Sequence, residues 1–156
     1  MTSSHADLLK GLLEEDAAAV RALGTHVDLA PGAVLFRLGD PAEAAYLIER
    51  GRIALTLPMR VAGQAQDVVV EERDEGQMLG WSALIPPHRF TLSATAPLAT
   101  RVLAIRRSAL MEFCAASPRV GYQVALNVAA IVGQRLQVVQ AMWLREMQRT
   151  VNNVHA

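Results

Sequence analysis

The chain carries two kinds of hydrophobic pattern, one after the other. Leucines and valines near the N-terminus recur at helical spacing, which predicts a helix over residues 5–23, capped by Ser4 and ended by Gly24. From about 26 to 105 the apolar residues instead fall in short runs separated by turn residues, as β-strands do. After Ile105 the helical spacing returns.

The short apolar runs in the middle of the chain are expected to be strands. They read HVDL, AVLF, AAYLIE, RIALTL, DVVVEE, FTLSATA and RVLAI. Their even spacing predicts an antiparallel roll or barrel rather than alternating strands and helices. The turn ERGR at 49–52 lies between two runs of alternating pattern and predicts a hairpin.

Two helices are expected after the strands. Ser108 is a candidate cap for the first, and Pro118 separates it from a longer helix over about 119–150. The longer helix carries two apolar stripes, of which only one can cover the roll. The first stripe is Val124, Ile131 and Val138, with Met142 nearby; the second is Ala125, Val128, Val132, Leu136, Val139, Trp143 and Met147.

The length of the last helix decides how its second stripe is covered. About thirty helical residues reach ~45 Å, which is longer than a domain of this size. We therefore expect the far end to meet a second copy of the chain; the alternative is that both stripes pack within one domain. The expected dimer contacts are Val138, Met142, Trp143 and Met147. Residues 1–118 would hold the N-terminal helix and the roll, and 119–156 the long helix of the same α+β domain.

Composition and charge narrow the class of protein. The chain is 52% hydrophobic and 19% charged, with 15 basic and 15 acidic residues, which is typical of a globular domain. The balanced charge argues against a nucleic-acid or anionic-membrane surface. No apolar run reaches the roughly 18 residues of a membrane span. The single cysteine, Cys114, excludes an internal disulfide and is typical of a reduced, cytoplasmic protein.

Candidate chemistry is sparse. The histidines His5, His26, His88 and His155 have no metal-ligand spacing, and no nucleophile elbow or phosphate-binding loop is present. We expect no catalytic residue, no metal and no cofactor. The run EERDEG at 71–76 is interpreted as a solvated strand end. The arginines of the last helix, Arg135, Arg145 and Arg149, fit a partner helix better than DNA.

Several motifs together resemble a known family. They are the opening run LAPGAVLFRLGDPAEAAYLIERGRIAL, the later run EGQMLGWSAL and the segment LSATA. In this order they resemble the cyclic-nucleotide-binding domain of the catabolite activator protein (Crp/Fnr) superfamily, over roughly residues 8–145. The resemblance implies an antiparallel β-roll (a jelly roll) with an N-terminal helix. It also implies a short phosphate-cassette helix and a long, dimerising C-terminal helix.

The expected cassette keeps the backbone features of an anion site. Gly80 lets the chain approach an anion closely, and the amides of Ser82 and Ala83 begin a short helix whose free N–H groups could donate to it. Ser93 and Ala94, on the closing strand, could add a hydroxyl and an amide.

The charged side chains of such a site are missing. In the nucleotide-binding members that the chain resembles, an acid follows the cassette glycine and an arginine precedes the Ser/Thr-Ala step. Here these positions hold Trp81 and Leu92. Two lost charge-assisted hydrogen bonds would cost about 3–6 kcal/mol, or about two to four orders of magnitude in affinity. We expect cAMP and cGMP to bind weakly or not at all.

Three interpretations of the altered pocket remain open. Arg89 could swing in and supply the missing positive charge. Trp81 and Leu92 could instead line a pocket for a nucleotide-like or other small molecule. In the third interpretation, Trp81 fills the pocket and Arg89 is a solvated loop charge.

The leading functional hypothesis is a non-catalytic regulatory or sensor module that is read through the long helix. The alternative is a constitutive dimerisation or protein-interaction scaffold. Because the chain ends at Ala156, we expect no helix-turn-helix segment and no DNA binding by this chain. A homodimer and a separate effector protein are the expected partners, and no membrane contact is expected.

Overall fold

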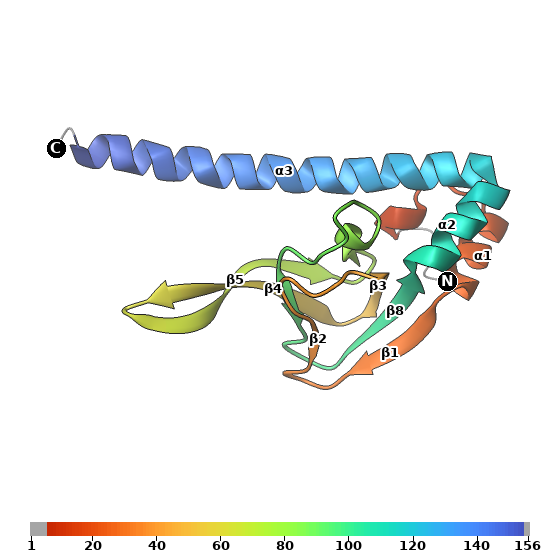
Figure 1. Cartoon of the computed structure of the whole chain (residues 1–156), viewed down its shortest axis with the longest axis horizontal. Helices are drawn as coiled ribbons and strands as arrows, with labels where there is room; N and C mark the ends of the chain where they lie inside the picture. Colours follow the sequence, from red (N-terminus) through yellow and green to blue (C-terminus); the bar gives the residue numbers. More distant parts are fainter. Residues whose placement is uncertain (1–5, 155–156) are drawn as a thin grey trace.

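A computed structural model describes residues 6–154 and confirms the α+β roll (Figure 1). The helical elements are the 3₁₀ turns η1 (Asp7–Leu9) and η2 (Trp81–Ala83) and the helices α1 (Glu14–Ala22), α2 (Arg107–Ala116) and α3 (Pro118–Val154). The strands are β1 (Thr25–Leu29), β2 (Val34–Phe36), β3 (Ala44–Arg50), β4 (Arg52–Val61), β5 (Gln64–Asp74), β6 (Met78–Leu79), β7 (Ser93–Thr95) and β8 (Thr100–Arg106).

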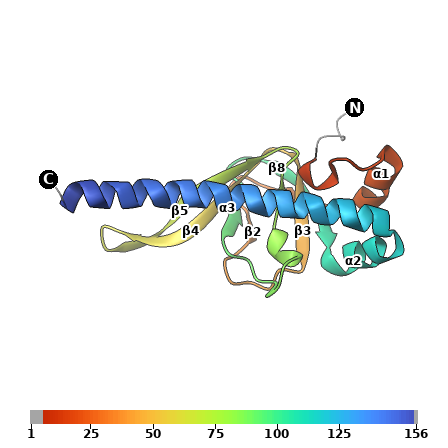
Figure 2. The same ribbon diagram turned by 90° about the horizontal axis from the view of Figure 1, so that it is seen from above.

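The strands form two antiparallel sheets that make up the roll. One sheet has the order β1-β8-β3-β6 and the other β2-β7-β4-β5. The second sheet ends in the long β4–β5 hairpin, which extends from the roll beneath the C-terminal half of α3 (Figures 1 and 2). None of the described helices combines the length and the apolar character needed to cross a bilayer.

The hairpin predicted at residues 49–52 is wrong. β3 and β4 flank this turn but belong to different sheets. At Gly51 the backbone has φ of 95°, and an added Cβ would lie 2.5 Å from Thr100 Oγ1, so the turn redirects the chain from one sheet to the other. The true hairpin joins β4 to β5 at residues 61–64, where Gly63 has φ of 81°. The alternation of apolar and polar residues indicates where strands and turns lie, but it does not indicate which strands pair.

The single N-terminal helix predicted over 5–23 is also wrong. The chain forms η1, then turns at Gly11, whose φ is 79°, before α1 begins at Glu14. A left-handed residue interrupts the helical hydrogen bonds, so the apolar spacing continues without a continuous helix. The predicted cap Ser4 lies outside the described residues. Ser108 is not a cap either, because α2 starts one residue before it, at Arg107.

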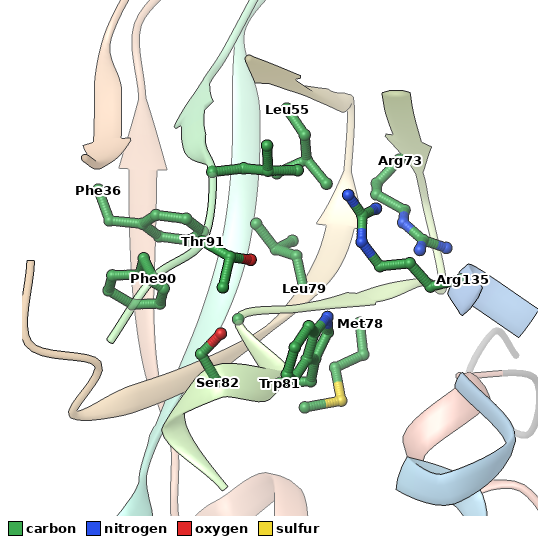
Figure 3. A pocket seen from close by; sticks show the side chains of 12 residues that line it. Phe36, Leu55, Arg73, Met78, Leu79, Trp81, Ser82, Phe90, Thr91 and Arg135 are labelled. Atoms are coloured by element: carbon green, nitrogen blue, oxygen red, sulfur yellow. The ribbon is translucent and has the colours of Figure 1, made fainter. Parts of the chain in front are cut away.

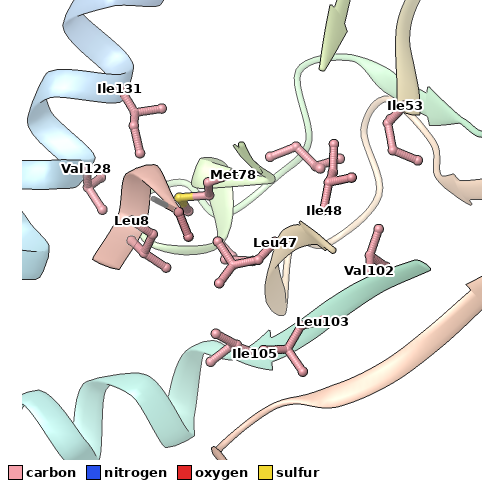
Figure 4. Close-up of a cluster of buried hydrophobic side chains, with 14 of the residues drawn as sticks. Leu8, Leu47, Ile48, Ile53, Met78, Val102, Leu103, Ile105, Val128 and Ile131 are labelled. Carbon is pink, nitrogen blue, oxygen red and sulfur yellow. The ribbon is translucent and has the colours of Figure 1, made fainter. Parts of the chain in front are cut away.

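The core lies between the two sheets and beneath the first half of α3 (Figure 4). Leu47, Val102 and Ile105 from the sheets are almost fully buried, as is Leu8 of η1. Val120, Val124, Val128 and Ile131 extend this core along α3. The buried face takes Val124 and Ile131 from the first predicted stripe and Val128 from the second, so the predicted division into two separate stripes is wrong. Every residue from 136 to 154 is exposed in the single chain.

A buried asparagine fixes the N-terminal turn to α3. Asn127 is 7% exposed, and its Nδ2 donates to the carbonyl oxygens of Leu8 and Lys10, each at 2.8 Å. Its Oδ1 accepts a hydrogen bond from Gln123. The side chain thus satisfies two backbone carbonyls that the break after η1 leaves outside a regular helix.

We expect the substitution Asn127→Ala to lower the free energy of unfolding by about 2–3 kcal/mol, because both carbonyls lose their buried donor. Urea unfolding monitored by circular dichroism measures the change. The matched control is Asn152→Ala, on the exposed part of the same helix, which should change stability by less than about 0.5 kcal/mol. Equal losses for the two variants would contradict this role of Asn127.

Candidate functional site

A small cavity lies where the predicted cassette meets the roll and α3 (Figure 3). We call it the cassette cavity. Its lining residues are Phe36, Leu55, Arg73, Met78, Leu79, Gly80, Trp81, Ser82, Phe90, Thr91, Leu92 and Arg135. Its volume is about 30 Å³, enough for one or two water molecules. Sites for drug-sized ligands measure about 300–1,000 Å³, so the cavity in this form is far too small for a nucleotide.

The cassette glycine has the geometry that the sequence predicts. Gly80 has φ of 75°, and a Cβ at this position would lie 3.2 Å from the Tyr46 ring. The helix that follows is a single 3₁₀ turn, in which the Ala83 amide donates to the Gly80 carbonyl at 3.0 Å. The Ala83 amide is therefore already hydrogen-bonded within the turn. Of the two residues that were predicted to donate an amide, only Ser82 lines the cavity.

The donors predicted on the closing strand lie elsewhere. Ser93 Oγ accepts a hydrogen bond from the Leu38 amide at 2.9 Å, which ties β7 to the turn before β3. Ala94 is fully buried in the core. Neither residue lines the cassette cavity.

The two substituted cassette positions both contribute to the cavity wall. Trp81 and Leu92 are half-buried and pack against the core. In Figure 3 the indole of Trp81 projects between the arginines on one side and Phe90 on the other. Phe36 and Phe90 stack with ring centroids 3.7 Å apart and extend the apolar wall. The wall around the cassette is thus aromatic and aliphatic, where the resemblance implied charges.

Arg89 does not line the cassette cavity. Its Nη1 donates to the Gly39 carbonyl at 2.8 Å, on the turn between β2 and β3. The neighbouring His88 contacts the Ser82 carbonyl through Nδ1 at 3.3 Å. The hypothesis that Arg89 rescues anion binding stays a prediction, and it requires breaking the Gly39 contact.

A charged cluster at the cavity was missed by the sequence analysis. We call Glu71, Arg73 and Arg135 the arginine cluster. Arg73 Nη2 lies 2.8 Å from Glu71 Oε1, and Arg135 of α3 forms an ion pair with the other carboxylate oxygen. Burial lowers the pKa of both guanidinium groups.

Two interpretations of the sequence therefore need correction. Residues 71 and 73 are not a freely solvated strand end, because the Arg73 side chain is 9% exposed. Arg135 contacts its own chain through Glu71. The spacing along α3 already indicates that Arg135 lies on the face that packs against the roll. Steps of four, three and four residues connect Val124, Val128, Ile131 and Arg135.

A second hollow is a groove between α2, α3 and the segment after η2. Its volume is about 800 Å³, and its lining is almost entirely apolar. Leu84, Ile85, Met111, Val128 and Val132 form much of it. Cys114, half-buried on α2, also lines the groove, and burial raises the pKa of its thiol. Within residues 6–154, no three His, Cys, Asp or Glu side chains are grouped to hold a metal ion.

The fold is similar to several solved structures. A cyclic nucleotide-binding domain from Methylobacillus flagellatus has a TM-score of 0.80 at 17% identity, covering 92% of this chain and 82% of that chain. The N-terminal domain of a transcriptional regulator from Streptomyces coelicolor has a TM-score of 0.72 at 24% identity, covering 85% and 93%. Thermus thermophilus catabolite activator protein has a TM-score of 0.73 at 24% identity. The match covers 88% of this chain but only 61% of that protein.

A family model matches the central part of the chain. No curated protein matches the chain. The model of the cyclic nucleotide-binding domain matches residues 26–117, which include the roll from β1 onward, the cassette and α2. The matched range is more than half of the 156 residues. The chain therefore belongs to the cyclic nucleotide-binding domain family.

Proposed function

We propose that this chain is a non-catalytic regulatory module whose cassette cavity senses a small molecule other than cAMP or cGMP. The observation that carries the proposal is the cavity itself. It retains the left-handed Gly80 turn, but its volume is about 30 Å³ and its cassette wall holds Trp81 and Leu92. A cyclic nucleotide would need the indole to move, and its phosphate would then meet a leucine.

The energy of such a complex is unfavourable for two reasons. The two missing charge-assisted hydrogen bonds would lower affinity by about two to four orders of magnitude. A phosphate placed against Leu92 would also lose hydration without gaining a partner. Cyclic nucleotides therefore bind weakly or not at all by the mode that the family resemblance implies.

The response of the module would be transmitted through α3 to a second copy of the chain. Trp143 and Met147 are 62% and 45% exposed in the single chain. With 3.6 residues per turn, they continue the face that carries Ala129 and lines the apolar groove. Val138 and Met142 are 46% and 51% exposed and continue the face of Ile131 beyond the roll.

A homodimer would bury these faces, which is the arrangement that apolar stripes of this length favour. Occupancy of the cavity would then change the position or pairing of α3, which a separate effector protein reads. We place this function in the cytoplasm, in keeping with the single free cysteine.

A constitutive scaffold is the second candidate, and the small cavity volume favours it. In this case Trp81 permanently fills the cavity, and the chain serves only to dimerise or to hold a partner. Thermal-shift measurements with cyclic mononucleotides, cyclic dinucleotides and a metabolite panel separate the two functions. A specific shift supports the sensor, and a flat panel supports the scaffold.

Restoring the two charges should restore cyclic nucleotide binding. We expect the double variant Trp81→Glu/Leu92→Arg to bind cAMP about two to four orders of magnitude more tightly than the unmodified chain. Isothermal titration calorimetry measures both affinities. Leu98→Arg, the same change at an exposed position, is the control and should gain nothing. Micromolar cAMP binding by the unmodified chain would contradict the proposal.

The outer face of α3 should determine the oligomeric state. We expect Trp143→Glu/Met147→Glu to convert a dimer to a monomer, because two charges would be buried at the interface. Size-exclusion chromatography with light scattering gives the mass. The control, Gln148→Glu, adds a charge to a polar position of the same helix and should leave the dimer intact. A monomeric unmodified chain at high concentration would rule out the dimer.

A further inference from the structure

The positive charge of the cassette cavity lies at the end that faces α3. Figure 3 shows Arg73 and Arg135 together on one side, with Phe36 and Phe90 on the opposite side. Both arginines line the cavity, one from β5 and one from α3. The cavity therefore has an apolar cassette end and a cationic helix end.

The arginine cluster holds two cations and one directly paired carboxylate. Glu71 bridges both guanidinium groups. Asp7 acts on Arg73 only over a longer distance, and its Oδ1 accepts hydrogen bonds from the Leu8 and Met78 amides instead. Burial raises the pKa of the Asp7 carboxyl. Glu71 is thus the only carboxylate in the described chain that pairs with either arginine.

One donor in the cluster has no partner. The Nε of Arg73 is buried, and no described residue accepts a hydrogen bond from it. The Arg73 side chain as a whole is 9% exposed. An unsatisfied buried N–H of a cation is costly, and a bound acceptor removes that cost. The geometry of a guanidinium favours a carboxylate or a phosphate, whose oxygens can accept two parallel N–H hydrogen bonds.

We propose that Arg73 and Arg135 form an anion site for the carboxylate or phosphoryl head group of a small organic molecule, and that this head group displaces Glu71. The proposal rests on the proposed sensor function of the same cavity and names the ligand class. The cavity of about 30 Å³ has room for only one or two water molecules, so the head group would take the space that the displaced Glu71 carboxylate vacates. The body of the ligand would lie against Leu55, Leu79 and Trp81, and a large body requires the indole to move.

The site explains how a ligand could act on the long helix. The Glu71–Arg135 ion pair joins β5 to α3 at the point where α3 leaves the roll. If an anion took the place of Glu71, Arg135 would lose its contact with the roll and gain a contact with the ligand. The ligand would thereby change how α3 is held, without any charge at the cassette positions.

Isothermal titration calorimetry of the full chain with benzoate and with phenyl phosphate, at constant ionic strength set by chloride, tests the site. We expect saturable binding, and the stronger of the two titrations identifies the head group. Arg135→Gln should weaken binding about tenfold or more. Glu71→Gln should strengthen it about tenfold, because the competing carboxylate is gone. The control Arg145→Gln, an exposed change on α3, should match the unmodified chain.

The opposite effects of the two variants separate a binding site from a structural cluster. A purely structural cluster predicts that Glu71→Gln lowers the melting temperature and gives no gain in anion binding. The absence of saturable binding in both the unmodified chain and Glu71→Gln would overturn the anion site. Equal binding in Arg135→Gln and the unmodified chain would also overturn it.

Titration of cAMP in the same series keeps the two proposals distinguishable. Tight cAMP binding to the unmodified chain overturns the proposed function, and the benzoate and phenyl phosphate titrations still decide the anion site. If neither cAMP nor the two anions bind, the anion site fails, and the thermal-shift panel still decides between the sensor and the scaffold.

Discussion

The packing of the first half of α3 on the roll is the interaction on which the rest of this structure depends. A stripe of valine and isoleucine side chains is buried there, and polar contacts flank it on both sides. Asn127 fixes the N-terminal turn by donating hydrogen bonds to two backbone carbonyls, and Arg135 pairs with Glu71 of β5. Arg135, at the end of this contact, lines the cassette cavity, and every residue from 136 to 154 is exposed in the single chain.

The turn at Gly80 and the charges of the cassette cavity come from different parts of the chain. Gly80 still turns through the left-handed region, which a side chain at that position would disfavour. The side chains that follow make an aromatic and aliphatic wall, and the cations come from β5 and α3 instead. Backbone geometry and charge are therefore separable in this fold, since a turn depends on φ while electrostatics depends on side chains from several elements.

The two hollows of the molecule differ in what they can accept. The cassette cavity of about 30 Å³ is small and partly cationic, whereas the groove of about 800 Å³ beside α2 and α3 is large and apolar. A small cationic site gains most from a compact anion, because desolvated charge pairs need close geometry. A large apolar groove gains most from another apolar surface. Arg135 lines the cavity and Val128 lines the groove, so α3 is common to both hollows.

The sequence alone determined the features that depend on neighbouring residues. Hydrophobic spacing located the strands and the long helix, and the residues around Gly80 predicted the glycine turn and the short helix that follows it. Only the tertiary structure decided that β3 and β4 lie in different sheets, that Ser93 and Arg89 are engaged elsewhere, and that Arg73 meets Arg135. The physical reason is that periodicity encodes which face of an element is buried. Which buried faces meet is set by how distant segments pack, and no local pattern contains that information.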